Sequence, residues 1–261
     1  MPARTKYAPG TPSWIDLATP DTSAAQRFYG ALFGWEFTEE ATDDPANPYV
    51  MATLGGKSVA GVMQLSEEMA AGGMPPAWSS YVTVADIDAS AAKVAELGGT
   101  VMQAPFDVMT AGRMAVCADP TGAVICLWQA KAHIGAELVN EHGTLTWNEI
   151  ITPDVAKATE FYVELFGWGA ETTDMGPMQY TSFVLGDRPV AGGMNPPMEG
   201  VPSFWGVYFN VDDTDALVEQ AKGLGATVVA EPMDIPPGRM ATLADPQGAM
   251  FNVLTWSEPT D

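Results

Sequence analysis

The stretch "TPSWIDLATPDTSAAQRFYGALFGW" at residues 11–35 recurs 133 residues later as "TLTWNEIITPDVAKATEFYVELFGW" at residues 144–168. The two stretches align without a gap and are identical at 12 of 25 positions. The match continues downstream, where "YVMATLGGKSVAGVM" pairs with "YTSFVLGDRPVAGGM" and "GRMAVCADPTGA" pairs with "GRMATLADPQGA". Self-similarity at a long offset indicates a duplication. The sequence therefore predicts two homologous domains, residues 1–130 and 144–261, joined by a connector at residues 131–143.

Each half opens with a short strand followed by a helix, and the first such pair shows the pattern best. A strand is predicted at residues 13–18, with Thr19 as the N-cap of the helix and Pro20 at its first position. Gly34 is expected to end the helix. Helical spacing then gives one apolar stripe, which consists of Ala25, Phe28, Tyr29, Leu32 and Phe33.

Strands are predicted after this helix at residues 36–39, 49–54 and 58–64, separated by Pro, Asn and Gly turns. A second unit repeats the order, with a strand at 79–84, a helix at 86–97 and strands at 101–103, 113–118 and 124–128. The unit strand–helix–strand–strand–strand thus occurs four times. Helices segregated from mostly antiparallel strands predict an α+β fold.

This order, with "RFYGALFGW" after the first strand and "DPTG" before the last, resembles the vicinal oxygen chelate superfamily. That group includes glyoxalase I, extradiol dioxygenases, fosfomycin-resistance enzymes and bleomycin-binding proteins. The resemblance covers nearly the whole chain, twice, and is greatest to tandem two-domain bacterial members labelled glyoxalase-like or hydroxylase. It implies that two βαβββ modules form a half-open, barrel-like sheet with the ligand in its concave interior. Pairing of modules within a half is the simplest arrangement; pairing across halves or between chains also fits the sequence.

The resemblance also implies where a metal would bind, because metal-dependent members carry His, Gln or Glu on the first, fourth, fifth and eighth strands. The fourth-strand segments, "SVAGVM" and "PVAGGM", contain no such residue. The other three points fall, in the two halves, on Trp14 and Trp147, on Ser79 and Gly206, and on Cys126 and Asn252. A divalent ion needs at least three His, carboxylate or thiolate donors. The sequence therefore predicts no metal and no cofactor.

The histidines point the same way. The only two, His133 and His142, lie in the connector, so the usual general base is expected to be missing from both predicted cavities. His133 is expected either to be a structural or solvated connector residue or to reach a site at the domain junction. The chain also lacks a Gly-rich phosphate loop, a nucleophile elbow and a Cys-x-x-Cys motif.

Strand alternation places Trp14 and Asp16 on one face, and likewise Trp147 and Glu149. Each cavity would then present an indole and a carboxylate. The indoles either plug the space of a metal site or stack on an aromatic ligand. Asp16 and Glu149 are the candidate catalytic residues, as general bases if burial raises their pKa.

Alternatively, the two carboxylates pair with Arg113 and Arg239, the Arg of each "GRM". In an enzyme these arginines would stabilise an oxyanion or enolate. Cys126 is expected to be a small buried hydrophobic residue rather than a nucleophile. The full set of candidate ligand-binding residues is Trp14, Tyr49, Met63, Trp78, Tyr81, Arg113, Cys126, Trp128, Trp147, Tyr180, Met194, Trp205, Tyr208, Arg239 and Asn252.

Composition limits the partners. The 261 residues include 11 Lys plus Arg and 33 Asp plus Glu, a formal net charge of −22, and 47% are hydrophobic. Such a chain can form a core, and its charge disfavours nucleic acid and anionic membranes. Two cysteines make no disulfide framework, and no signal-peptide core or membrane span is evident, so a cytoplasmic protein is expected.

Two functions remain open. The first is metal-independent binding of a small apolar or aromatic molecule, such as a polyketide-like metabolite or antibiotic. The second is a metal-independent glyoxalase-like enzyme, or a pathway hydroxylase component, that uses Asp16 or Glu149 as a base. Either would act on a small molecule as a monomer or homodimer.

Overall fold

The computed structural model describes residues 3–40, 42, 48–174 and 179–257. The first half contains β1 (Pro12–Thr19), α1 (Thr22–Phe33), β2 (Glu36–Glu40), β3 (Tyr49–Leu54), β4 (Lys57–Gln64), α2 (Glu67–Ala71), β5 (Ala77–Thr83), α3 (Ile87–Glu96), β6 (Thr100–Val108), β7 (Gly112–Ala118) and β8 (Val124–Ala130). The second contains β9 (Thr144–Ile151), α4 (Val155–Phe166), β10 (Gly169–Asp174), β11 (Gln179–Leu185), β12 (Arg188–Met194), β13 (Phe204–Asn210), α5 (Thr214–Gly223), β14 (Thr227–Ile235), β15 (Gly238–Ala244) and β16 (Met250–Trp256).

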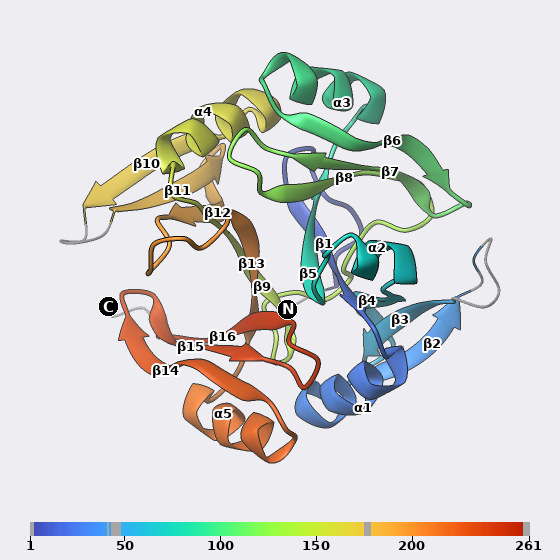
Figure 1. Cartoon of the computed structure of the whole chain (residues 1–261), viewed down its shortest axis with the longest axis vertical. Coiled ribbons are helices and arrows are strands. Elements are labelled where there is room, and N and C mark those ends of the chain that lie inside the picture. The colour runs from blue at the N-terminus through green and yellow to red at the C-terminus, as the bar shows by residue number, and fades with distance from the viewer. Residues whose placement is uncertain (1–2, 41, 43–47, 175–178, 258–261) are drawn as a thin grey trace.

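Each half forms one eight-stranded sheet, which confirms the α+β fold with two βαβββ modules per domain. The strand order is β2-β3-β4-β1-β5-β8-β7-β6 in the first half and β10-β11-β12-β9-β13-β16-β15-β14 in the second. The first strands of the two modules pair antiparallel, β1 with β5 and β9 with β13. Modules therefore pair in sequence order within a half. Each sheet curves without closing, and we call the concave faces the first cup (β1–β8) and the second cup (β9–β16) (Figure 1).

Two local expectations were wrong. Asp21, not Thr19, is the N-cap of α1, and its carboxylate accepts a hydrogen bond from the Ala24 N–H at 2.9 Å. Strand β1 continues through Thr19, which is fully buried and lies opposite Gln64 of β4. Strand β6 is longer than expected because it is an exposed edge strand with register shifts, so its sequence shows no clear alternation. The short helix α2 was not predicted.

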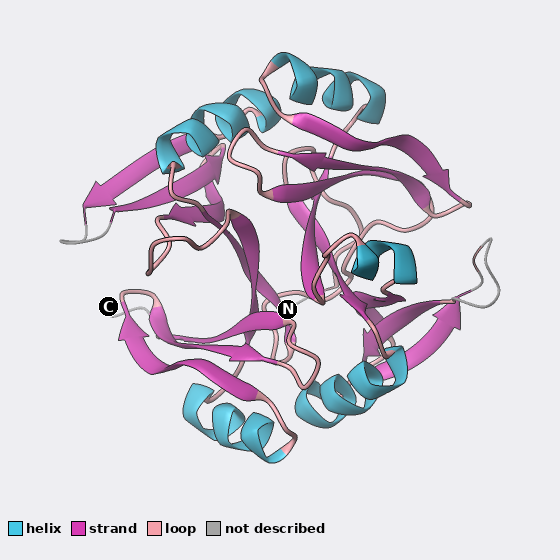
Figure 2. Cartoon of the chain, in the orientation of Figure 1, coloured by secondary structure: helices cyan, strands magenta, loops and turns pink. Residues whose placement is uncertain are grey.

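The two sheets lie back to back, so the cups open on opposite sides of the molecule (Figure 1). The helices gather at two ends, α1 with α5 and α3 with α4 (Figure 2). Each of the two main clusters of buried apolar residues takes side chains from both halves. In one cluster, for example, Phe33 of α1 packs against Phe209 of β13 with ring centroids 4.9 Å apart. The hydrophobic core is therefore shared between the halves.

The duplicated motifs make the contacts between the halves. Tyr162 of α4 donates to the Asp119 carboxylate in "DPTG" at 2.8 Å and accepts the Trp205 indole N–H at 2.8 Å. The equivalent hydrogen bonds in the other direction run from the Trp78 indole N–H to the Tyr29 hydroxyl and from this hydroxyl to the Asp245 carboxylate, each at 3.1 Å. Because all these groups are buried, their hydrogen bonds replace those that water would make.

The Trp that ends each "LFGW" also reaches across to the other half. The Trp35 indole donates to the Gly143 carbonyl at 2.8 Å, and the Trp168 indole donates to the Gly10 carbonyl at 2.7 Å. Gly143 has a φ of 71° and Gly10 a φ of 85°, a region that favours glycine. Within the described ranges, no helix is long and apolar enough to span a membrane.

Candidate functional site

A chain of hydrogen-bonded side chains occupies the floor of the first cup. The Trp14 indole donates to the Tyr49 hydroxyl at 2.9 Å, and this hydroxyl donates to the Asp16 Oδ2 at 3.3 Å. The Tyr81 hydroxyl donates to the same Oδ2 at 2.7 Å. Strand alternation explains the arrangement, because Trp14 and Asp16 point into the cup while Ile15 and Leu17 pack in the shared core. The predicted placement of Trp14 and Asp16 on the same face of the strand is confirmed.

The second cup repeats this arrangement with a glutamate. The Trp147 indole donates to the Tyr180 hydroxyl at 3.0 Å, and the Tyr208 hydroxyl donates to the Glu149 Oε2 at 2.6 Å. The Tyr180 hydroxyl lies close enough to Glu149 to lower the pKa of this carboxyl. Each cup therefore holds an indole, two phenols and one carboxylate, and we call these four side chains the cup tetrad.

A tyrosine packs over a glycine of the fourth strand in each cup, next to the carboxylate. Gly61 lies opposite Asp16 in the sheet, and Gly192 lies opposite Glu149. A Cβ at Gly61 would overlap the Tyr49 hydroxyl, and a Cβ at Gly192 would overlap that of Tyr180. Among the residues that the structure describes, no three His, Cys, Asp or Glu side chains gather closely enough to hold a metal ion. The residues present therefore do not fit the metal centre that the fold family implies.

Burial changes the acidity of both carboxyls. Asp16 is 2% exposed, and desolvation raises its pKa from 3.8 to about 6, against the opposing effect of the Tyr81 and Tyr49 hydrogen bonds. Burial likewise raises the pKa of Glu149, which the hydrogen bonds of Tyr208 and Tyr180 partly offset. Desolvation disfavours the charged form of an acid. Near neutral pH, both groups can therefore act as weak bases or as hydrogen-bond acceptors.

The first cup is largely filled by the connector. The His133 imidazole packs edge-on against the Trp14 indole, with centroids 4.5 Å apart and planes at 85°, and the His133 carbonyl accepts the Trp128 indole N–H at 2.9 Å. Ala136 is fully buried in the same cluster as Trp14, Tyr81, Cys126 and Trp128. Trp14 is 4% exposed as a result. His133 thus lies in the first cup, contrary to the expectation that the cavities lack histidine.

The second cup is more open. Trp147 is half-buried where Trp14 is buried, whereas Tyr180 and Met194 are half-buried like their counterparts Tyr49 and Met63, and Glu149 is buried. The lining is also more polar, since Thr242 donates to Asn252 at 2.6 Å. The corresponding positions of the first cup carry Val116 and Cys126.

Trp256 is a further residue of the second cup that was not predicted. Its indole is 43% exposed and donates to the hydroxyl of Thr146, the neighbour of Trp147, at 2.8 Å. Trp256 lies two and four positions beyond Leu254 and Asn252 on β16, so alternation places all three on the concave face. An exposed Trp at the end of the last strand was the available signal.

Two predicted lining residues lie on the opposite face. Trp78 and Trp205 pack in the shared core, where their indoles donate to Tyr29 and Tyr162. Their assignment to the cups was wrong. Each lies three positions from the cup tyrosine of its strand, so alternation alone would have placed the two on opposite faces.

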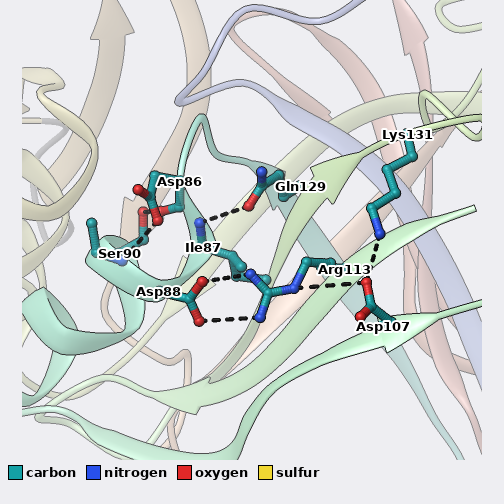
Figure 3. A network of polar contacts seen from close by, with 9 residues as sticks. Asp86, Ile87, Asp88, Ser90, Asp107, Arg113, Gln129 and Lys131 are labelled. Atoms are coloured by element: carbon teal, nitrogen blue, oxygen red, sulfur yellow. Dashed lines mark hydrogen bonds and ion pairs between the residues drawn. The ribbon is translucent and has the colours of Figure 1, made fainter.

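The predicted pairing of the two arginines with the cup carboxylates was also wrong. Arg113 forms a two-pronged ion pair with Asp88 at the start of α3, with N–O distances of 2.5 and 3.1 Å, and approaches Asp107 at 3.8 Å (Figure 3). Arg239 binds Asp215 and Asp234 in the same way. Both arginines thus lie on the helix side of their sheets, because α3 and α5 pack there. Neither is placed to stabilise an anion in a cup.

The remaining candidates divide between the cups. Tyr49, Met63 and Trp128 belong to the first, and Met63 is half-buried. Burial raises the pKa of the Cys126 thiol far above its usual range, so this thiol is not poised as a nucleophile. Asn252, its counterpart, is held by Thr242 and donates to the Val207 carbonyl at 3.1 Å.

Comparisons with known proteins support one family. A sequence model described as the Glyoxalase/Bleomycin resistance protein/Dioxygenase superfamily matches residues 144–253, and one described as a Glyoxalase-like domain matches residues 14–128. A Mycobacterium tuberculosis protein named "Putative glyoxylase CFP32" is 49% identical over 97% of this chain and 98% of its own length. The "Anthracycline biosynthesis protein DnrV" of Streptomyces peucetius is 37% identical over 97% of this chain and 96% of its own.

Solved structures show the same fold at low identity. The Mn(II)-bound glyoxalase of Novosphingobium aromaticivorans aligns with a TM-score of 0.67 at 14% identity, over 99% of this chain and 85% of that one. The 2,2',3-trihydroxybiphenyl 1,2-dioxygenase of Sphingomonas wittichii aligns with a TM-score of 0.66 at 12% identity, over 95% of this chain and 91% of that one. With its duplicated βαβββ modules and full-length relatives, the chain belongs to the glyoxalase/bleomycin resistance/dioxygenase family, the vicinal oxygen chelate superfamily, as a tandem two-domain member.

Proposed function

We propose that this protein binds a small, largely apolar or aromatic molecule without the help of a metal, and that the second cup is the binding site. One observation carries the proposal. In the second cup, the half-buried Trp147 and Tyr180 lie over the buried Glu149, at the place where family members bind ligand through a metal.

The chemistry of the second cup favours a neutral or cationic ligand. An indole face and edge bind flat apolar groups, while Glu149 and Asn252 offer hydrogen-bonding atoms. The net charge of −22 opposes an anionic ligand. A polyketide-like metabolite or antibiotic combines these properties, and the relative named as an anthracycline biosynthesis protein supports that class.

The cellular location, the oligomeric state and the domain boundaries are part of the same proposal. The protein would act in the cytoplasm as a monomer or homodimer, with no nucleic-acid or membrane partner, as its acidic charge favours. The domains would divide at residues 1–130, 131–143 and 144–261, in keeping with the two separate sheets.

A second function, a metal-independent glyoxalase-like enzyme or pathway hydroxylase component, is favoured by the acidity of the cup carboxyls. Burial raises the pKa of both Asp16 and Glu149, which suits a general base. Glu149 could take a proton from carbon next to a ligand carbonyl and return it at another atom. Asp16 is less suited to this role, because its cup is filled by the connector.

Fluorescence titration tests the binding function. A panel of neutral polycyclic aromatic natural products, including anthraquinones, is added to the purified full chain and the Trp emission is followed. We expect saturable quenching that Trp147→Leu weakens about tenfold or more, the scale of a central aromatic contact. Arg113→Gln serves as the control, because Arg113 lies on the far side of the other sheet. No response across the panel, or equal binding by Trp147→Leu, contradicts the proposal.

The enzyme alternative has its own test. Glu149→Gln preserves the shape of the side chain but cannot accept a proton. Turnover of a bound panel member by the wild type, abolished in Glu149→Gln with binding retained, identifies an enzyme. If both proteins bind the compound and neither turns it over, binding is the only function that remains.

A further inference from the structure

The protein carries an aromatic ring of its own on one of its two cup tetrads. The His133 ring meets the Trp14 indole edge-on at a centroid distance of 4.5 Å, and the Trp128 indole at 5.9 Å. These are favourable separations for aromatic pairs. The His133 Nε2 is buried and has no hydrogen-bond partner within the described residues. The ring itself is therefore held by packing, while the His133 backbone is held by the hydrogen bond from its N–H to the Ala111 carbonyl and by the one that its carbonyl accepts from the Trp128 indole.

Burial disfavours a charge on the ring that occupies the first cup. Burial lowers the pKa of His133, against the opposing influence of Glu137. The cup offers a neutral ring an apolar wall, with Met51 and Val116 packed against the same cluster.

The second cup has the same tetrad, and no such occupant is found among the residues that the structure describes. The indole–phenol hydrogen bonds are 2.9 Å in the first cup and 3.0 Å in the second, and the phenol–carboxylate bonds are 2.7 Å and 2.6 Å. Duplicated sequences have thus built two nearly identical tetrads, while the neighbouring Val116, Cys126 and Trp128 of the first cup correspond to Thr242, Asn252 and Leu254 in the second. Among the described residues, no aromatic ring packs against Trp147, which is half-buried where Trp14 is covered.

We propose that the His133 ring marks a ring-binding position, and that in the second cup a neutral planar aromatic ring of the ligand takes the equivalent position, edge-on to Trp147. The inference rests on the proposed function and deepens it, because it gives the ligand class and its orientation. A five- or six-membered ring fits, with or without a ring nitrogen, since the first cup makes no hydrogen bond to the His133 Nε2. Trp256, exposed beside Thr146 on the same face, borders this position.

The test uses 4-methylimidazole, which reproduces the His133 side chain, at a pH above the pKa of this probe. The indole N–H signals of Trp14 and Trp147 are followed by two-dimensional NMR of the full chain, because each N–H has a fixed tyrosine partner and will sense a ring placed beside it. In the wild type we expect a saturable shift of the Trp147 signal alone. In His133→Ala we expect the Trp14 signal to respond as well, so that the number of sites rises from one to two. His133→Leu, which refills the space with an aliphatic side chain, should behave as the wild type.

The outcomes separate the two proposals. A wild type in which both indole signals respond, or neither, overturns the ring-binding position, as does a His133→Ala variant whose Trp14 signal stays unchanged. The wild-type measurement stands even if the His133 variants fold poorly. Panel compounds that bind the second cup equally in Trp147→Leu would support a ligand in that cup but overturn the ring position. If the Trp147 signal responds to 4-methylimidazole but no compound of the panel binds, the ring position is supported and the proposed class of polycyclic aromatic ligands is contradicted.

Discussion

Replacing Asp16 by Asn should change how the stability of the protein depends on pH. The Asp16 side chain is buried, with 2% of the residue exposed. Its Oδ2 accepts hydrogen bonds from the Tyr81 and Tyr49 hydroxyls, and its Oδ1 has no hydrogen-bond partner within the described residues. Asn has nearly the same shape but does not titrate. The variant therefore isolates the cost of charging this one buried group.

The sign follows from the raised pKa of Asp16, which is 3.8 for an exposed aspartate and about 6 in the folded chain. Between these pH values, the folded chain keeps a proton that the unfolded chain has lost. The stabilisation is complete below the unfolded pKa and is lost as the pH rises through the folded pKa. A shift of two units corresponds to about 3 kcal/mol, since one unit is about 1.4 kcal/mol. The stability of the wild type relative to Asp16→Asn should therefore fall by about 3 kcal/mol from about pH 4 to about pH 7.

Urea unfolding at several pH values, followed by Trp fluorescence and circular dichroism, gives the two stabilities. Taking the difference between the proteins cancels the general effect of the net charge. Asp88→Asn is the control, because the Arg113 ion pair lowers the pKa of this exposed carboxyl and its dependence has the opposite sign. A wild-type minus Asp16→Asn difference that stays flat with pH, or rises, would refute the reasoning.

Two further predictions concern buried groups. Tyr162→Phe should cost about 3 kcal/mol, because it leaves the buried Trp205 indole N–H without an acceptor and removes a donor from Asp119; a single urea transition, coincident by both probes, should remain. A cost below about 1 kcal/mol would contradict the view that these bonds hold the two halves together. Cys117 and Cys126 should resist alkylation of the native protein near pH 8, because burial raises the pKa of Cys117 to about 11 and that of Cys126 further. Rapid labelling of Cys126 without unfolding would show that the first cup opens.

Much of the fold could be predicted from the sequence, because the helical period of about 3.6 residues and the strand period of two are both local properties of the chain. The apolar stripe of α1 and its end at Gly34 appeared as predicted, as did the shared face of Trp14 and Asp16. The errors arose where a residue's environment depends on the other half. Trp78 was placed in a cup, yet it faces a core that includes Phe209 of the second half.

The sequence by itself determined the duplication and the module order, since each follows from residue type and spacing along the chain, while the lack of metal ligands was an expectation taken from the family resemblance. Only the tertiary structure decided what replaced those ligands and which cup stays open. Tyr49 of β3 and Tyr180 of β11 reach toward the carboxylates across the intervening strands β4 and β12, over glycines that leave room for a phenol. The connector folds back so that His133 covers Trp14 but not Trp147. Such contacts join residues far apart in the chain, and local patterns carry no record of them.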